Sequence, residues 1–164
     1  PEIKSLTEPY DVVVTGIGGT GVVTIGAILG MAAHLEQKGI SVLDVAGLAQ
    51  KNGMVYSHLR FAPEPSDIHA VRISAGGADL LLGCDLVSAG DAETLAKLRV
   101  GNSRGVVNDH QTMTADFTRS PDMLFPEIGF KKTMELGQLG KTVFWKKIEH
   151  AQKPKRTLLK NALV

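Results

Sequence analysis

The sequence predicts an α/β fold, a three-layer α/β/α domain on a mainly parallel sheet that is antiparallel in part. Three observations lead to this prediction. Short apolar segments bounded by turn residues alternate with helical segments, as in layered α/β domains. A glycine-rich turn joins the first such segment to the first helix, which is typical of a Rossmann-like βαβ unit. The stretch Pro63-Glu64-Pro65 separates two extended segments as a hairpin turn would, which predicts some antiparallel pairing.

Each strand is predicted from a short run of apolar or β-branched residues. The first covers residues 11–15, and a helix over 22–38 follows it, with Gly39 where a helix-ending glycine would stand. Asp85 is placed to cap a second helix that runs to about Leu98. The remaining strands are predicted over residues 40–44, 55–62, 70–73, 79–83 and 105–108.

Length and composition exclude several classes of protein. The chain has 164 residues, about one domain's worth, with 43% hydrophobic and 21% charged residues. A disordered tail, a collagen-like rod and a coiled coil are therefore excluded, and no apolar run is long enough to predict a membrane span. The net charge of +1 gives no reason to expect nucleic acid as a partner. With Cys84 as its single cysteine, the chain is expected to be cytoplasmic.

The charge divides the chain into two regions. Nine of the 18 basic side chains lie between Lys131 and Lys160, a stretch whose acidic residues are Glu135 and Glu149 alone. We therefore expect a compact domain over residues 1–125. Residues 126–164 would form a basic tail, either helical or an incomplete continuation of the domain. The absence of a Met start or an apolar signal segment at Pro1 is consistent with a piece of a longer chain.

The glycine turn is the clearest candidate site. Its sequence, G-I-G-G-T-G over residues 16–21, matches G-x-G-x-x-G between a strand and a helix. Glycines permit a tight turn and close backbone approach, and the helix N-terminus offers free N–H groups at the positive end of its dipole. The pattern predicts a phosphate-binding site whose candidate residues are Gly16, Gly18, Gly19, Thr20 and Gly21.

Three interpretations of this turn remain open. A dinucleotide site for NAD or FAD needs a carboxylate about twenty residues on, at the end of the second strand. Asp44 ends that strand but lies 28 residues after Gly16. The spacer and lysine of a P-loop are absent, so a phosphate of another kind is the second interpretation, and a purely structural turn is the third. Lys51 lies on a loop that could meet the bound anion, or it is an ordinary exposed lysine.

Other reactive side chains predict no chemistry of their own. Cys84 is followed by Asp85, whose charge disfavours a thiolate nucleophile. His58 is expected to orient its neighbours or to lie at an interface, and no histidine stands at metal-ligand spacing. Arg60 and Arg72 are expected to pair with acidic side chains.

Three segments, over residues 11–30, 42–61 and 67–85, resemble the gamma-type domain of the 2-oxoacid:ferredoxin oxidoreductases. The motifs that carry the resemblance are V-V-V-T-G-I-G-G-T-G-V-V-T, D-V-A-G-L-A-Q-K-N-G-M-V-Y-S-H-L-R and D-I-H-A-V-R-I-S-A-G-G-A-D-L-L-L-G-C-D-L. The strongest resemblance is to the fused indolepyruvate branch, and it covers roughly residues 11 to 125. Asn52 stands where many members have glycine, and the family pattern cannot be followed after about Phe125.

The resemblance implies one part of a larger oligomeric enzyme. Such enzymes oxidatively decarboxylate a 2-oxoacid, here an arylpyruvate, to an acyl-coenzyme A and pass the electrons to ferredoxin. Thiamine diphosphate, magnesium and the iron–sulfur clusters would lie on other domains or subunits. This domain would have no catalytic residue and would help to hold coenzyme A, with the glycine turn and Lys51 as the contacts. A dehydrogenase fragment that binds NAD(P) or FAD through Asp44, and an assembly domain that binds nothing, are the alternatives.

Overall fold

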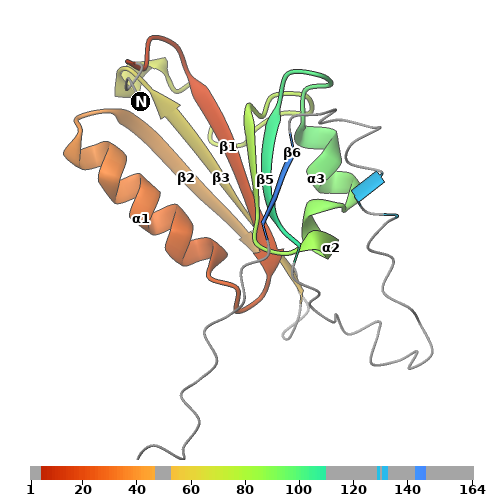
Figure 1. Ribbon diagram of the computed structural model, residues 1–164. Helices are drawn as coiled ribbons and strands as arrows, with labels where there is room; N and C mark the ends of the chain where they lie inside the picture. The colour runs from red at the N-terminus through yellow and green to blue at the C-terminus, as the bar shows by residue number, and fades with distance from the viewer. Residues whose placement is uncertain (1–4, 47–52, 110–128, 130, 133–142, 147–164) are drawn as a thin grey trace, which may run out of the picture.

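The computed structural model describes residues 5–46, 53–109, 129, 131–132 and 143–146. Within them lies one six-stranded sheet in the order β2-β3-β1-β4-β5-β6 (Figure 1). The strands are β1 Tyr10–Ile17, β2 Gly39–Ala46, β3 Met54–Ala62, β4 Leu80–Gly83, β5 Arg104–Asn108 and β6 Val143–Lys146. The helical elements are α1 Val22–Leu35, the 3₁₀ turn η1 Pro65–Asp67, α2 Leu86–Ala89 and α3 Ala92–Lys97.

The sheet has an antiparallel half and a parallel half. β3 is antiparallel to both of its neighbours, β2 and β1. From β1 onward the pairs β1–β4, β4–β5 and β5–β6 are all parallel. The predicted mainly parallel, partly antiparallel sheet is therefore confirmed. The first βαβ unit is split, because β1 and β2 run in the same direction but β3 lies between them.

The helices cover opposite faces of the sheet, as the three-layer prediction requires. Successive side chains of a strand point to opposite faces. In β1, Val12 and Val14 pack with Val22 of α1, whereas Val13 packs with Leu86 and other residues around α2 and α3. Two separate apolar cores therefore lie on the two faces, with β1 contributing to both.

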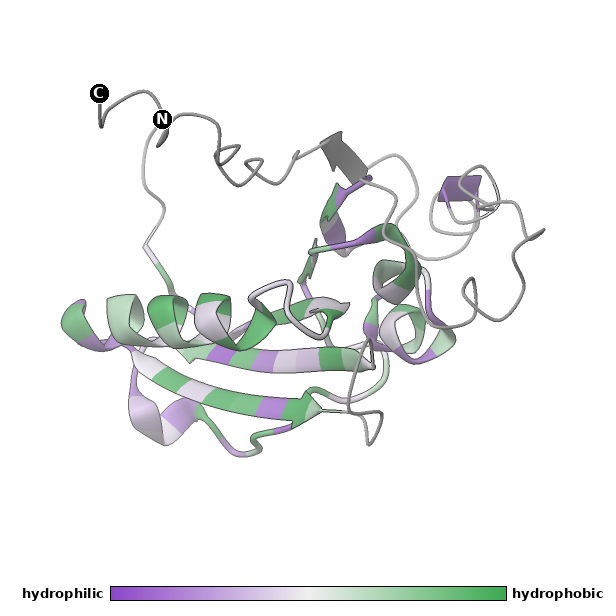
Figure 2. Ribbon diagram, turned by 90° about the horizontal axis from the view of Figure 1, so that it is seen from below, coloured by the Kyte–Doolittle hydropathy of each residue, from purple (hydrophilic) through white to green (hydrophobic). Residues whose placement is uncertain are grey.

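Helix α1 approaches the sheet through its small residues. A Cβ atom on Gly26 would lie 2.6 Å from Ser57 Oγ, and one on Gly30 would lie 3.0 Å from Val42 Cγ2. Val22, Ile25 and Leu29 pack in the core beside these glycines. Three other large apolar residues of α1 point outward: Ile28, Met31 and Leu35 are 63%, 59% and 75% exposed. Figure 2 shows that apolar residues recur along the whole helix.

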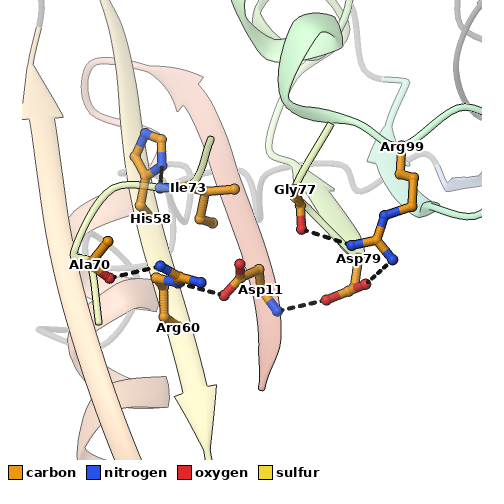
Figure 3. Close-up of polar contacts among 8 residues, drawn as sticks. All are labelled: Asp11, His58, Arg60, Ala70, Ile73, Gly77, Asp79 and Arg99. Carbon is orange, nitrogen blue, oxygen red and sulfur yellow. Dashed lines mark hydrogen bonds and ion pairs between the residues drawn. The ribbon is translucent and has the colours of Figure 1, made fainter. Parts of the chain in front are cut away.

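The predicted strand over residues 70–73 is wrong. This segment is a loop, held by the side chains of β3 instead of a strand ladder (Figure 3). Arg60 Nη1 donates to the Ala70 carbonyl at 2.9 Å, and the Ile73 amide donates to His58 Nδ1 at 3.2 Å. The antiparallel partners of β3 are β1 and β2, so the hairpin expected around Pro63-Glu64-Pro65 does not form.

The predicted helix from Asp85 to Leu98 is two short helices. Asp85 caps α2 as expected, since its side chain accepts a hydrogen bond from the Ser88 amide. Helix α2 ends at Gly90, and Asp91 caps the start of α3. The prediction of helical structure in this range is confirmed, and the prediction of one continuous helix is wrong.

Two ion pairs lie at the start of neighbouring strands. Where β1 and β4 begin, Asp11 pairs with Arg60 at 2.8 Å and Asp79 pairs with Arg99 at 3.5 Å (Figure 3).

Beyond residue 126, β6 continues the sheet beside β5. Most of the region expected to be a basic tail lies outside the described residues.

Candidate anion-binding turn

The glycine turn lies where β1 and β4 both end. These strands are parallel neighbours, but the helices that follow them, α1 and α2, leave toward opposite faces. This is a topological switch point, the place where open α/β sheets bind their ligands. The position of the turn in the fold is therefore that of a binding site.

Glycines give the turn its shape. Gly19 and Gly21 have φ angles of 93° and 86°, in the left-handed region that favours glycine. At Gly16 the constraint is space, because an added Cβ would overlap Thr20 Oγ1 and lie 2.9 Å from Cys84 Cβ. Thr20 closes the turn, donating from its amide at 3.0 Å and from its hydroxyl at 2.6 Å to the Ile17 carbonyl.

The first half of the turn uses its amides within the protein. The Ile17 amide donates to Asp85 Oδ2 at 2.8 Å. The Gly18 amide donates to the Gly53 carbonyl at 2.9 Å, which joins the turn to the residue before β3. Since the Thr20 amide is bonded to Ile17, these three N–H groups are not free for a ligand.

The second half leaves its amides open. Within the described residues, no protein acceptor binds the backbone N–H groups of Gly19, Gly21, Val22, Val23 and Thr24. Gly21 is the N-cap of α1 but has no capping side chain, and the first turn of α1 holds no acidic residue. The partial positive charge at this helix end is therefore uncompensated by the chain described.

A cavity of about 280 Å³ lies over the open amides. All five residues with open amides line this cavity. Its lining residues are Ile17, Gly19, Gly21, Val22, Val23, Thr24 and Val55. Open donors, a positive helix end and a cavity thus coincide, which is the arrangement that binds phosphate groups.

The structure divides the predicted site residues by position. Gly19 and Gly21 line the cavity, whereas Gly16, Gly18 and Thr20 shape the turn beneath it. Lys51 lies outside the described residues, so its part in the site stays a prediction. The cavity also involves Val22, Val23 and Thr24, which the glycine pattern did not single out; the signal was the helix start itself, because the first N–H groups of any helix lack partners.

Asp44 does not lie beside the turn. It pairs with Ser57 in the sheet, and its Oδ1 lies 3.6 Å from the position of a Cβ on Gly26, the fifth residue of α1. Because β3 separates β2 from β1, two strand spacings of about 10 Å in total lie between Asp44 and the strand that leads into the turn. A dinucleotide site would have β2 directly beside β1.

Cys84 lies next to the turn as an uncharged thiol. Burial, and secondarily the nearby Asp85 charge, raise the pKa of Cys84 to about 11. The expected lack of a nucleophilic thiolate agrees with this direction. Burial, followed by the charges of Lys97 and Arg72, lowers the pKa of His58, which accepts a hydrogen bond from Ile73 as a neutral ring.

The predicted arginine pairings are confirmed. Arg60 is bonded to Asp11 at 2.8 Å, and Arg72 contacts Glu93 at 3.2 Å. In the described part of the chain, no group of three His, Cys, Asp or Glu side chains is arranged to hold a metal ion. Among the same residues, no helix has the length and apolar character needed to cross a membrane.

A second, larger cavity of about 730 Å³ lies on the α1 face at the other end of β1. Residues of α1, β1, β3 and β4 and of the segment before β1 line it. Its lining is mainly apolar and consists of Ser5, Leu6, Tyr10, Val12, Leu29, Ala32, Ala33, Glu36, Lys38, Phe61, Leu80 and Leu82. It shares no lining residue with the cavity at the turn and offers few polar groups to orient a ligand.

Comparisons with known proteins agree with the predicted resemblance. Indolepyruvate oxidoreductase subunit IorB of Thermococcus kodakarensis is 34% identical over 80 residues, which cover 49% of this chain and 38% of that protein. IorB of Archaeoglobus fulgidus is 27% identical over 117 residues, or 69% of this chain and 55% of that protein. The match therefore spans about two fifths to a little over half of these relatives' length.

A solved structure shares the fold. The pyruvate oxidoreductase subunit PORC of Thermotoga maritima superposes with a TM-score of 0.51 at 16% identity, over 69% of this chain and 56% of that subunit. At this identity the likeness concerns the fold alone. The family model for pyruvate ferredoxin/flavodoxin oxidoreductase matches residues 11–159, nearly the whole sequence. The chain therefore belongs to the pyruvate ferredoxin/flavodoxin oxidoreductase family.

Proposed function

We propose that the chain is the gamma-type part of an indolepyruvate-type 2-oxoacid:ferredoxin oxidoreductase and that its glycine turn holds a phosphate group of coenzyme A. The whole enzyme would be an oligomer in the cytoplasm. It would decarboxylate an arylpyruvate oxidatively, form an acyl-coenzyme A and reduce ferredoxin. Family membership and the relatedness to IorB subunits support this proposal.

The open amides at the start of α1 are the observation that carries the proposal. Coenzyme A contains a pyrophosphate and a 3′-phosphate, and a helix N-terminus with free N–H groups is a natural partner for either. A cavity of about 280 Å³ fits one such group but not the whole cofactor. The remainder of coenzyme A would therefore lie outside it, and Lys51 would add a charged contact.

The redox chemistry would lie elsewhere in the enzyme. Thiamine diphosphate, with magnesium, supplies the stabilised carbanion for decarboxylation, and iron–sulfur clusters carry the electrons. Cys84 is the chain's single cysteine, so a cluster bound by four cysteines needs other domains or subunits for its ligands. The residues of this chain would bind and orient the acyl acceptor, and none of them would act as a catalytic residue.

The position of Asp44 favours this proposal over a dinucleotide site. A carboxylate that binds the ribose of NAD would need to lie near the turn, and here β3 intervenes. The assembly alternative, in which the turn contacts a neighbouring domain and binds nothing, differs from the proposal in a measurable way, because it leaves the open amides unchanged on addition of ligand.

Titration of the full chain with coenzyme A tests the proposal. We expect the backbone amide NMR signals of Gly19, Gly21 and Val22 to shift with coenzyme A but not with NADH, while those of Gly76 and Gly101 stay constant. Lys51→Ala should weaken binding by about 1–3 kcal/mol, the value of a charge-assisted contact. Shifts with NADH alone would favour the dinucleotide alternative. No shift with either ligand, in the chain and in the assembled enzyme, would favour the assembly domain.

A further inference from the structure

We propose that Asp85 is a positioning residue for the glycine turn, whose buried carboxylate holds the turn in the shape that exposes the amides of α1. The inference rests on the proposed function for its ligand, but the geometry that supports it lies within the protein. Asp85 is 68 residues from Ile17 in sequence and meets it at the switch point between β1 and β4.

The carboxylate of Asp85 joins two turns. The side chain is fully buried. Its Oδ2 accepts hydrogen bonds from the Ile17 amide at 2.8 Å and from Ser88 Oγ at 2.7 Å, and its Oδ1 accepts one from the Ser88 amide at 2.8 Å. One oxygen therefore anchors the glycine turn, and the carboxylate as a whole caps α2.

Burial makes this anchor rigid. A buried carboxylate is stable only while donors satisfy it, so the Ile17 amide cannot rotate away without leaving charge unpaired. The carbonyl of the same residue accepts both hydrogen bonds from Thr20. Ile17 is thus held on both sides, and the segment between it and α1 is confined to a short loop with Gly19 and Gly21 in the left-handed region.

An amide in place of the carboxylate would break this arrangement. Asparagine has one acceptor oxygen, whereas Asp85 uses both of its oxygens for backbone N–H groups. If the Asn oxygen faced Ile17, its NH₂ group would face the Ser88 amide, and the reverse orientation would place NH₂ against the Ile17 amide. In either orientation the Asn NH₂ group faces a backbone N–H group, so two buried donors meet without an acceptor.

The test compares Asp85→Asn with Asp91→Asn in the full chain. Asp91 is a matched control because it caps the next helix, accepting from the Glu93 amide at 2.9 Å and from the Tyr56 hydroxyl at 3.1 Å, without contact to the turn. We expect Asp85→Asn to speed hydrogen exchange of the Ile17 amide and to raise the Kd for coenzyme A, each by about tenfold or more. Asp91→Asn should change neither by more than about twofold. If Asp85→Asn does not fold, Ser88→Ala, which keeps the carboxylate and removes one donor, should leave exchange at Ile17 and the Kd near those of the unmodified chain.

The outcomes separate this inference from the proposed function. A folded Asp85→Asn chain with unchanged Ile17 exchange, or one that binds coenzyme A with unchanged affinity, overturns the positioning role. The same holds if Ser88→Ala alone loosens Ile17, because the carboxylate, which this variant keeps, would then not be enough to hold the turn. If the unmodified protein binds no coenzyme A, either alone or in the assembled enzyme, while Asp85→Asn still speeds exchange at Ile17, the proposed function is refuted and Asp85 is retained as the anchor of the turn.

Discussion

The N-terminus of α1 differs from those of α2 and α3 in what its backbone amides bind. Asp85 caps α2 and Asp91 caps α3, each with a carboxylate that accepts a hydrogen bond from a first-turn amide. Gly21 caps α1 with no side chain at all. Each short helix therefore has a first-turn amide bonded to its capping carboxylate, whereas no side chain caps the first turn of the long helix.

This difference indicates that the capped ends of α2 and α3 contribute to stability, whereas the uncapped end of α1 is available to bind a ligand. A capping side chain contributes about 1 kcal/mol, and α2 and α3, with 4 and 6 residues, are too short to form without local support. Helix α1 has 14 residues, and packing on the sheet through Gly26 and Gly30 stabilises it independently. It can leave its end uncapped, and the cavity of about 280 Å³ lies at that end.

The largest effect that would sharpen this comparison is expected from removing the two capping carboxylates. Asp85→Ala should lower the free energy of unfolding by about 3 kcal/mol, because it leaves the buried amides of Ile17 and Ser88 without acceptors. Asp91→Ala, at a more exposed cap, should lower it by about 1 kcal/mol. Urea unfolding of the two variants measures both values. Equal losses would contradict the special position of Asp85.

A smaller effect is expected from a methyl group inside the turn. Gly19→Ala and Gly101→Ala both add a Cβ at a positive φ, where the structure leaves open space, so each should lower stability by about 1–2 kcal/mol. Of these two glycines, Gly19 lines the cavity and Gly101 does not. Calorimetric titration should therefore show weaker coenzyme A binding for Gly19→Ala alone, and equal affinities for the two variants would remove Gly19 from the site.

Most of the fold could be predicted because its strands are short apolar runs between turn residues. What could not be read from sequence was which strands are neighbours. The alternation of side chains over residues 55–62 predicts a half-exposed strand, but β3 inserts between β1 and β2 and is buried on both faces over residues 56–59. Residues 70–73 have a strand-like pattern too, yet hydrogen bonds from Arg60 and to His58 hold them as a loop.

The candidate site divides in the same way. The glycine spacing predicted the turn, and the helix that follows predicted a positive end for an anion. Which amides stay open depends on partners distant in sequence. The Gly53 carbonyl accepts a hydrogen bond from the Gly18 amide, and the Asp85 carboxylate accepts one from the Ile17 amide. Asp85 was predicted only as the cap of its own helix, because no local pattern shows that its second oxygen reaches back to the first turn.

The smallest change in stability is expected from giving α1 the acidic first turn that it lacks, and this change tests the comparison most directly. Thr24 is exposed and lies in that first turn. Thr24→Glu should raise the free energy of unfolding by about 0.3–1 kcal/mol, because a carboxylate favours a helix N-terminus. The same charge would repel a phosphate group from the open amides, so coenzyme A binding should weaken. Thr24→Gln, similar in size but uncharged, is the control and should change both quantities less. If Thr24→Glu stabilises the chain and leaves coenzyme A affinity unchanged, the ligand does not bind at this helix end. Stability should rise while coenzyme A affinity falls, because the same backbone amides would bind either the introduced carboxylate or the phosphate of the ligand.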